Sequence, residues 1–217
     1  MKRVSIILAA ILVVCATTAR AQTPPAGAAP HEFFVAVGGG ITAGHAVGAL
    51  VNVDLGKRLN EGWDVYLEVG RMLDTRTADV DVAAKVITDY LGTSATSTAK
   101  QPASYGAIGL RYRVPTGGRV QPYVGVGLGV AKVTRDVNFF VNGANVNAVL
   151  LDTYGVQLGT DLSGSETKAL VTFSLGAQIP VSDSIFADVS YRFGRVFLAD
   201  AGLNTSRLQF GIGLRFR

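Results

Sequence analysis

Few side chains in this 217-residue chain have the type and spacing to do chemistry, and His45 is the first to consider. A histidine acts as a general base when a nucleophile such as serine and an orienting carboxylate lie within hydrogen-bond reach. The segment around it, Gly44-His-Ala-Val-Gly48, supplies neither group, and His31, the second histidine, follows a segment rich in proline and alanine. We therefore expect His45 to be a solvated loop residue, and we predict no catalytic residues and no enzyme activity.

Two further patterns suggest ligand sites but lack the residues that would complete them. Gly39 and Gly44 have the spacing of a phosphate-binding loop, but His45 and Ala46 stand where such a loop needs Lys and Ser or Thr. Asp79 and Asp81 lack the neighbours that would complete a shell of about six to eight oxygen ligands. We expect neither a metal nor a cofactor.

The strongest pattern in the chain is an alternation that reaches its last residue. From Arg207 to Arg217, large apolar side chains alternate with arginine, glutamine or glycine. A period of two is typical of a strand with one apolar and one polar face. Lipid outside and a tight, charged interior would suit this pair of faces.

Seven other segments alternate in the same way, and the connections between the eight follow a pattern of their own. The segments span residues 32–43, 49–59, 63–74, 103–115, 120–134, 169–181, 184–197 and 206–217. Brief connections follow the second, fourth and sixth segments, whereas 76–102 and 135–168 are long and 44–48 and 198–205 are shorter. Short turns on one side and long loops on the other are typical of outer-membrane barrels.

The fold class predicted from these features is all-β, namely an eight-stranded antiparallel up-and-down transmembrane β-barrel with short periplasmic turns and long extracellular loops. A lipocalin-like barrel would place its apolar residues inside. A β-sandwich would not be expected to alternate its connections so regularly.

The polar faces of the strands predict a filled interior. Eight strands leave just enough room for side chains, and unpaired charges there would be costly. We therefore predict a plugged lumen with a salt-bridge network. Its members would be Asp54, Arg58, Asp64, Glu68, Arg111, Arg113, Asp188, Arg192, Arg207 and Arg215.

The N-terminal residues predict export. Lys2 and Arg3 precede an apolar run, and Ala19-Arg20-Ala21 offers a cleavage site, so residues 1–21 are predicted to be a signal peptide cut near Ala21. Residues 22–30 would form a flexible periplasmic leader and 31–217 the barrel. Three of the 20 basic residues lie in the signal peptide, which leaves 17 against 16 acidic ones and gives no reason to expect a nucleic-acid partner.

Three basic residues are predicted to mark the outer rim of the barrel. Arg71, Lys132 and Arg195 follow the outward phase of their strands. Each lies eight residues beyond an outward residue at the other end, a rise of roughly 20 Å and close to the height of the apolar band. They would either reach an interface as ordinary basic side chains do, or bind lipopolysaccharide phosphates.

The long loops hold two structural signals. Residues 80–91 could form a short helix, with Val80, Ala83, Ala84, Ile87 and Leu91 near one face, and Asn142-Gly143 is typical of a hairpin turn. We then expect strands five and six of the barrel to extend above the membrane. The apolar residues nearby could form a binding surface or pack on one another, and packing is favoured; these are Phe139, Phe140, Val149, Leu150 and Leu151.

The tail resembles the signal by which the barrel-assembly machinery recognises its clients, with Gln209, Gly211, Leu214 and Phe216 at the defined positions. Arg217 departs from the pattern, which usually ends on the aromatic residue. With the eight strands and the signal peptide, the chain resembles the small outer-membrane barrels, a family that includes the transmembrane domain of outer-membrane protein A and the OmpX-like and opacity-type proteins. The resemblance implies the outer membrane of a Gram-negative-type bacterium, contact with outer-membrane lipid and lipopolysaccharide, periplasmic chaperones during assembly, and a monomer.

The function expected from these features is envelope integrity, or surface interaction through the extracellular loops. A narrow channel for small hydrophobic solutes is the alternative. A lipid-modifying enzyme is a third possibility and would require a serine or carboxylate within hydrogen-bond reach of His45.

Overall fold

A computed structural model describes residues 33–116, 118–160, 162–198 and 202–216. The predicted signal peptide, the leader and His31 lie outside these residues. The strands are β1 (Phe33–Ala43), β2 (Val47–Arg58), β3 (Trp63–Met72), β4 (Ala95–Lys100), β5 (Ala103–Arg113), β6 (Gln121–Val141), β7 (Ala144–Asn145), β8 (Ser163–Pro180), β9 (Ile185–Val196) and β10 (Leu203–Phe216). The helices are α2 (Ala78–Leu91), the 3₁₀ turn η1 (Asn147–Val149) and α3 (Leu150–Tyr154).

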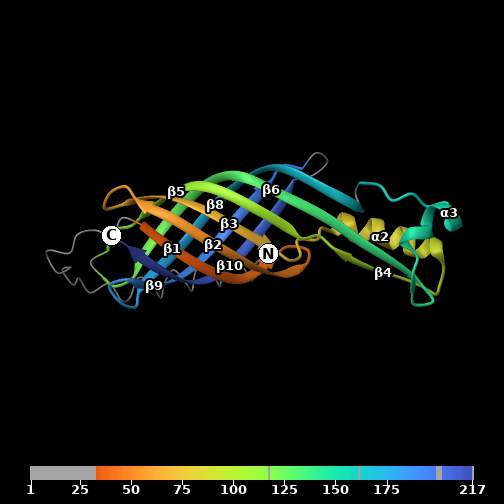
Figure 1. The fold of residues 1–217 in the computed structure, drawn as a ribbon, viewed down its shortest axis with the longest axis horizontal. Coiled ribbons are helices and arrows are strands. Elements are labelled where there is room, and N and C mark those ends of the chain that lie inside the picture. Colours follow the sequence, from red (N-terminus) through yellow and green to blue (C-terminus); the bar gives the residue numbers. More distant parts are fainter. Residues whose placement is uncertain (1–32, 117, 161, 199–201, 217) are drawn as a thin grey trace, which may run out of the picture.

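Eight of the strands close into a barrel in which all neighbours are antiparallel. The order around the ring is β1, β2, β3, β5, β6, β8, β9, β10 and back to β1. The first and last strands pair from Phe33 with Phe216 to Ala43 with Ser206. The predicted fold class is therefore confirmed (Figure 1). Within the described ranges, no helix has the length and apolar character needed to span a membrane.

The two ends of the barrel differ as predicted. One end, called here the turn end, carries the brief connections around residues 60–62, 116–119 and 182–183. The other, called the distal end, carries α2, β4 and α3 (Figure 1). The predicted end of the fifth barrel strand at residue 134 was too early, because β6 continues to Val141 and pairs there with β4.

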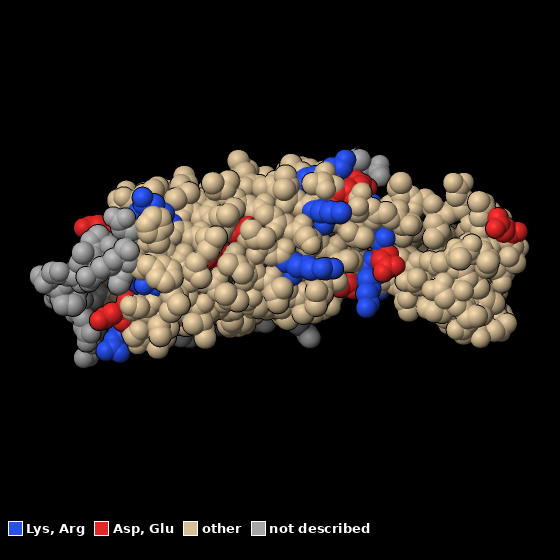
Figure 2. All heavy atoms as spheres, viewed as in Figure 1, with Lys and Arg blue, Asp and Glu red and all other residues tan. Residues whose placement is uncertain are grey.

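The outer face of the barrel is an apolar belt. Val126, Leu128 and Val130 on β6 point outward and are exposed, as are Phe210 and Ile212 on β10. Charged side chains on the face shown in Figure 2 gather near the two ends of the barrel, and the belt between them is mostly uncharged. This distribution suits a surface that meets lipid in the middle and polar groups at both rims.

Inward glycines make room for large inward side chains. Gly109 on β5 lies beside the ring of Tyr66, where an added Cβ would stand 2.6 Å from the ring Cζ and against the carbonyl oxygen of Val126. Gly176 on β8 lies beside Tyr123 in the same way. The tyrosines therefore fill the parts of the lumen that glycines on neighbouring strands leave free.

Replacing Gly109 by alanine should destabilise the barrel. The new Cβ would meet the backbone of β6, which cannot yield as a flexible side chain can, so the free energy of unfolding should fall by about 1–3 kcal/mol. Urea titration in lipid vesicles, followed by heat-modifiable gel mobility, measures the change. Gly106→Ala on the same strand is the control, because its nearest atom is the Glu68 carbonyl oxygen at 4.0 Å. Equal stability of the two variants would contradict this account.

Candidate functional site

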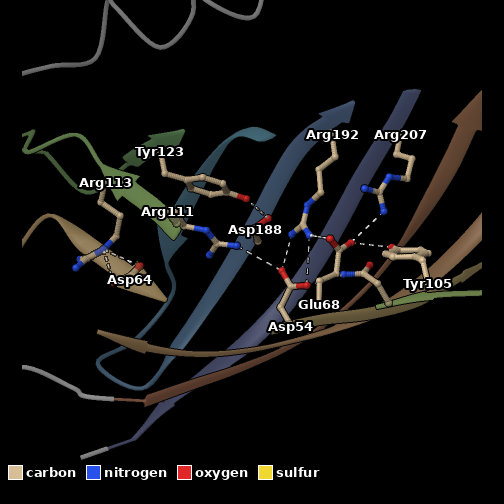
Figure 3. A network of polar contacts seen from close by, with 11 residues as sticks. Asp54, Asp64, Glu68, Tyr105, Arg111, Arg113, Tyr123, Asp188, Arg192 and Arg207 are labelled. Atoms are coloured by element: carbon tan, nitrogen blue, oxygen red, sulfur yellow. Dashed lines mark hydrogen bonds and ion pairs between the residues drawn. The ribbon is translucent and has the colours of Figure 1, made fainter. Parts of the chain in front are cut away.

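Glu68 is the centre of an ion-pair layer inside the barrel (Figure 3). Its side chain is fully buried and binds Arg192 at 2.6 Å and Arg207 at 3.1 Å, while the hydroxyl of Tyr105 donates to it at 2.7 Å. Because β3 and β9 lie opposite each other in the ring, the contact between Glu68 and Arg192 crosses the lumen. A carboxylate buried this deeply needs such partners, because burial without them would be costly.

Asp54 joins the same layer from β2. It binds Arg192, and it pairs with Arg111 of β5 at 3.4 Å. Arg111 also lies over the rings of Tyr66 and Tyr123, at 5.1 and 4.2 Å from their centroids. Cation–π contacts of this kind stabilise a desolvated guanidinium group. Asp54, Glu68 and three arginines thus form one connected network.

The remaining members of the predicted set face the lumen but are held differently. Asp64 and Arg113 form a separate pair at 3.0 Å. Asp188 accepts a hydrogen bond from Tyr123 at 3.0 Å, and Arg215 donates to the amide oxygens of Gln121 and Gln178. Arg58 is half-buried and forms no ion pair within the described residues. The structure therefore brings five of the ten residues into one network and leaves the other five outside it.

Apolar layers close the lumen on both sides of these charges. At the distal end, Leu50, Met72, Val133, Leu170 and Val196 pack together and are almost completely buried. At the turn end, Phe34 packs edge-on against Phe186, with ring centroids 6.1 Å apart. A cavity beside Asp188 and Arg192 has a volume of about 10 Å³, no more than the space that one water molecule needs. The lumen is therefore filled with side chains.

Replacing Glu68 by glutamine should strongly destabilise the barrel. Arg192 and Arg207 would keep their charges but lose their shared carboxylate, and breaking a buried pair costs about 3–5 kcal/mol. Urea titration in vesicles gives the loss. Glu61→Gln, at an exposed turn position, is the charge-matched control and should behave as the unaltered chain does. A Glu68→Gln barrel as stable as that control would refute the role given to this network.

His45 is exposed to solvent in the loop after β1, and it also contacts a side chain of α2. Its Nε2 lies 2.8 Å from Asp81 of α2, and the other oxygen of Asp81 lies 3.1 Å from Arg76. His45 is therefore an exposed loop residue, as predicted, and its contact with Asp81, which was not predicted, arises because the loop after β1 reaches the start of α2. No serine is bonded to His45 in the described ranges, and the nearby hydroxyl of Thr75 donates to a backbone carbonyl. The contact between His45 and Asp81 links the loop after β1 to α2.

The three predicted rim residues are exposed and point away from the lumen. Arg71 and Lys132 are the two neighbours of Ser104 across β3, β5 and β6, so their backbones lie about 10 Å apart on one row of the wall. Arg195 contacts Asn204 at 3.4 Å and lies over the ring of Phe197. All three lie on the distal side of the apolar belt, Arg71 and Arg195 next to the ends of β3 and β9 and Lys132 midway along β6.

The residues of the predicted assembly signal all lie on β10. Gln209 points into the lumen and is buried, whereas Leu214 and Phe216 point outward into the apolar belt. Gly211 faces Gly38 of β1, the strand that closes the barrel.

A packed substructure stands on the distal end, called here the distal unit and made of residues 78–100 and 136–160. Val80 and Ala84 of α2 pack with Phe139 of β6 and Leu150 of α3 in an apolar core of its own. The predicted helix is confirmed as α2. The hairpin is confirmed by the positive φ of Asn142 and Gly143 and by the pairing of Phe140 with Asn145.

The apolar residues of the second long loop divide between the two alternatives. Phe139 and Leu150 are buried in the core of the distal unit, whereas Val149 and Leu151 are exposed. On α2, the exposed residues Val82, Val86 and Tyr90 follow at intervals of four, so the helix also has an outer apolar stripe. The distal unit is therefore both internally packed and apolar in part of its surface.

The wall that supports the distal unit is braced by an ion pair. Arg135 of β6 binds Glu166 of β8 at 2.7 Å, and Lys168 lies 3.7 Å from the same carboxylate. The hydrogen bond from Arg135 lowers the pKa of Glu166 from its ordinary value, so the pair keeps its charges into mildly acidic conditions.

Two groups of residues in these sites were missed from the sequence. The inward tyrosines Tyr66, Tyr105 and Tyr123 share the phase of the charged residues, and that phase could have identified them. By contrast β4, Ala-Thr-Ser-Thr-Ala-Lys, has no large apolar residue, and nothing in its sequence distinguishes it from a loop.

Comparisons with known proteins agree with this architecture. The model of a family described as "Outer membrane protein beta-barrel domain" matches residues 6–216. Neisserial surface protein A is similar in structure, with a TM-score of 0.57 and 13% identity over 88% of this chain and 100% of that chain. The N-terminal β-barrel domain of Pseudomonas aeruginosa OprF gives 0.51 and 15% over 84% and 97%.

A third similar structure is Ail, the attachment invasion locus protein of Yersinia pestis, with a TM-score of 0.50 and 15% identity over 87% of this chain and 100% of that chain. At these identities the likeness shows the fold alone. No curated protein matches the sequence.

Proposed function

We propose a function for this chain on the premise that it belongs to the outer membrane protein beta-barrel domain family, whose members lie in the outer membrane. The barrel is a sealed anchor, and the distal unit is the part that acts, by binding a ligand outside the cell. The observation that carries this proposal is the combination of a filled lumen with a separately packed unit above it. Ordering so many residues costs conformational entropy, which a role for their surface would explain.

The two alternative functions receive less support. A channel for small solutes would need a path through the ion-pair layer and the apolar layer above it, where Leu50 and Met72 are almost fully buried. A lipid-modifying enzyme would use His45, which does have a carboxylate at 2.8 Å. That carboxylate is shared with Arg76, and the arrangement lacks a bonded serine among the described residues, so it fits a structural contact better.

Removing the distal unit should separate binding from anchoring. A variant in which short glycine-serine turns replace residues 78–100 and 136–160 should keep heat-modifiable mobility, because all eight barrel strands retain their partners in the membrane. It should lose ligands that the full chain retains on an array of immobilised extracellular proteins and glycans. An unchanged set of ligands, or ion conductance by the full chain in a planar bilayer, would overturn the proposal.

We also propose that Arg71, Lys132 and Arg195 hold lipopolysaccharide around the barrel. Their guanidinium and ammonium groups lie outward at the distal edge of the apolar belt, where phosphate groups of that lipid would accept charge-assisted hydrogen bonds. Close spacing of Arg71 and Lys132 on one row favours two contacts to a single headgroup.

Changing all three rim residues to glutamine should reduce the lipopolysaccharide that co-purifies with the barrel by about tenfold or more, since each lost charge-assisted bond contributes about 1.5–3 kcal/mol. Quantitative phosphate analysis of the purified protein measures it. Lys57→Gln is the control, because Lys57 is also exposed and outward but lies at the turn end. Retention equal to that of the unaltered protein would show that the three residues only snorkel.

A further inference from the structure

Within the described sheet, the distal unit contains a strand edge that no other strand covers. β4 continues the line of β5 along β6, with Lys100 opposite Asp136 and Ala95 opposite Val141. In the barrel, the other side of β5 is paired with β3, but β3 ends at Met72, and the chain then turns into α2. In the described sheet β4 therefore has β6 on one side and no strand on the other.

The hydrogen bonds of β4 show which of its backbone N–H and C=O groups point away from β6 and lie on the free edge. The carbonyl of Ala99 accepts from the side chain of Arg76 at 2.6 Å, and the amide of Ala95 donates to Gly92, so these odd-numbered residues point away from β6. Ser97 lies between them and points the same way. Neither its N–H nor its C=O has a partner in the hydrogen bonds of the described residues.

A groove runs beside this edge. Its volume is about 480 Å³, and its walls are Ser97, Thr98 and Ala99 on one side and α2 on the other. Lys85 and Asp89 project from the helix wall and contact each other at 2.7 Å, with side chains that are mostly exposed. Such exposed pairs contribute little to stability, about 0.3–0.5 kcal/mol, so both charges can be redirected to a ligand.

The spacing of these charges matches an extended chain. Residues four apart on a helix are separated by about 6 Å along its axis, and alternate residues of a strand by about 6.6 Å. A strand paired with Ser97 would thus place two side chains of one face opposite Lys85 and Asp89 in turn. Asp81, the next position along the helix, is already neutralised by Arg76.

We propose that the free edge of β4 binds an extended peptide segment by β-strand addition, with an acidic side chain opposite Lys85 and a basic one two residues away opposite Asp89. Backbone hydrogen bonds to Ser97 supply affinity, and the two charges supply selectivity. Arg76, which occupies the carbonyl of Ala99, marks one end of the site. This inference rests on the proposed function, because it names the class of ligand that the distal unit takes.

A labelled synthetic peptide of about nine residues, mainly threonine and valine with Glu and Lys two positions apart, is the probe. It should bind the full chain in detergent micelles, as measured by fluorescence anisotropy. N-methylation of alternate backbone amides, on the edge that faces β4, should abolish binding. Peptides with two Glu or two Lys at those positions should bind more weakly. Equal binding of the N-methylated peptide would overturn strand addition.

Two substitutions at one position test the backbone contact. Ser97→Pro removes the outward N–H and leaves the bonds of β4 to β6 intact, as proline on a sheet edge allows. It should weaken peptide binding about tenfold or more, because the peptide carbonyl loses its donor. Ser97→Ala is the matched control, since it keeps the N–H and changes only the side chain, and it should bind as the unaltered chain does. Heat-modifiable mobility must be normal in both.

The outcomes separate the two proposals. If the array ligands depend on the distal unit but Ser97→Pro binds them and the peptide normally, the unit acts through another surface and strand addition is wrong. If the array ligands do not depend on the unit at all, the proposed function is wrong. In the double variant Lys85→Asp with Asp89→Lys the two charges exchange places, so the peptide should bind in the opposite direction, as read from a spin label at one peptide end. That reversal would support the roles given to the two charges, and an unchanged direction would contradict them.

Discussion

The burial of Glu68 between Arg192 and Arg207 is the interaction on which the interior of this barrel depends. Eight strands enclose a space that side chains fill, so a charge that is fully buried there needs a partner. The contact between β3 and β9 joins opposite sides of the ring. Around this contact, large tyrosine side chains occupy the space that the inward glycines leave free.

Because the interior is filled, the proposed function assigns ligand binding to the outer surfaces of the chain. The apolar layer around Leu50 and Met72 separates the charges from the distal end. Beyond that layer, β6 alone runs without interruption from the turn end to Val141 and carries the distal unit. Because β6 is braced by β8 through Arg135 and Glu166, the unit stands on a sheet rather than on a loose loop.

Much of the fold could be predicted from the sequence, since a strand in a membrane barrel shows its two faces directly as a period of two. The turns, the helix over 78–91 and the Asn142-Gly143 hairpin also have local signals. β4 does not, because its existence depends on an unoccupied edge of β6 and not on its own small and polar residues. The contact between His45 and Asp81 joins positions 36 residues apart, and neither segment indicates the other.

The sequence by itself determined which side chains face the lumen, which face lipid, and which end of the barrel carries the long connections. Alternation fixes these because each residue's side follows from its neighbours along the strand. Only the tertiary structure decided that Glu68 meets Arg192 and Arg207, that Arg215 binds amides, and that β4 has a free edge. Those outcomes depend on how the strands are staggered around a closed ring and on where β3 ends. Both are fixed by contacts across the barrel rather than by the order of residues along the chain.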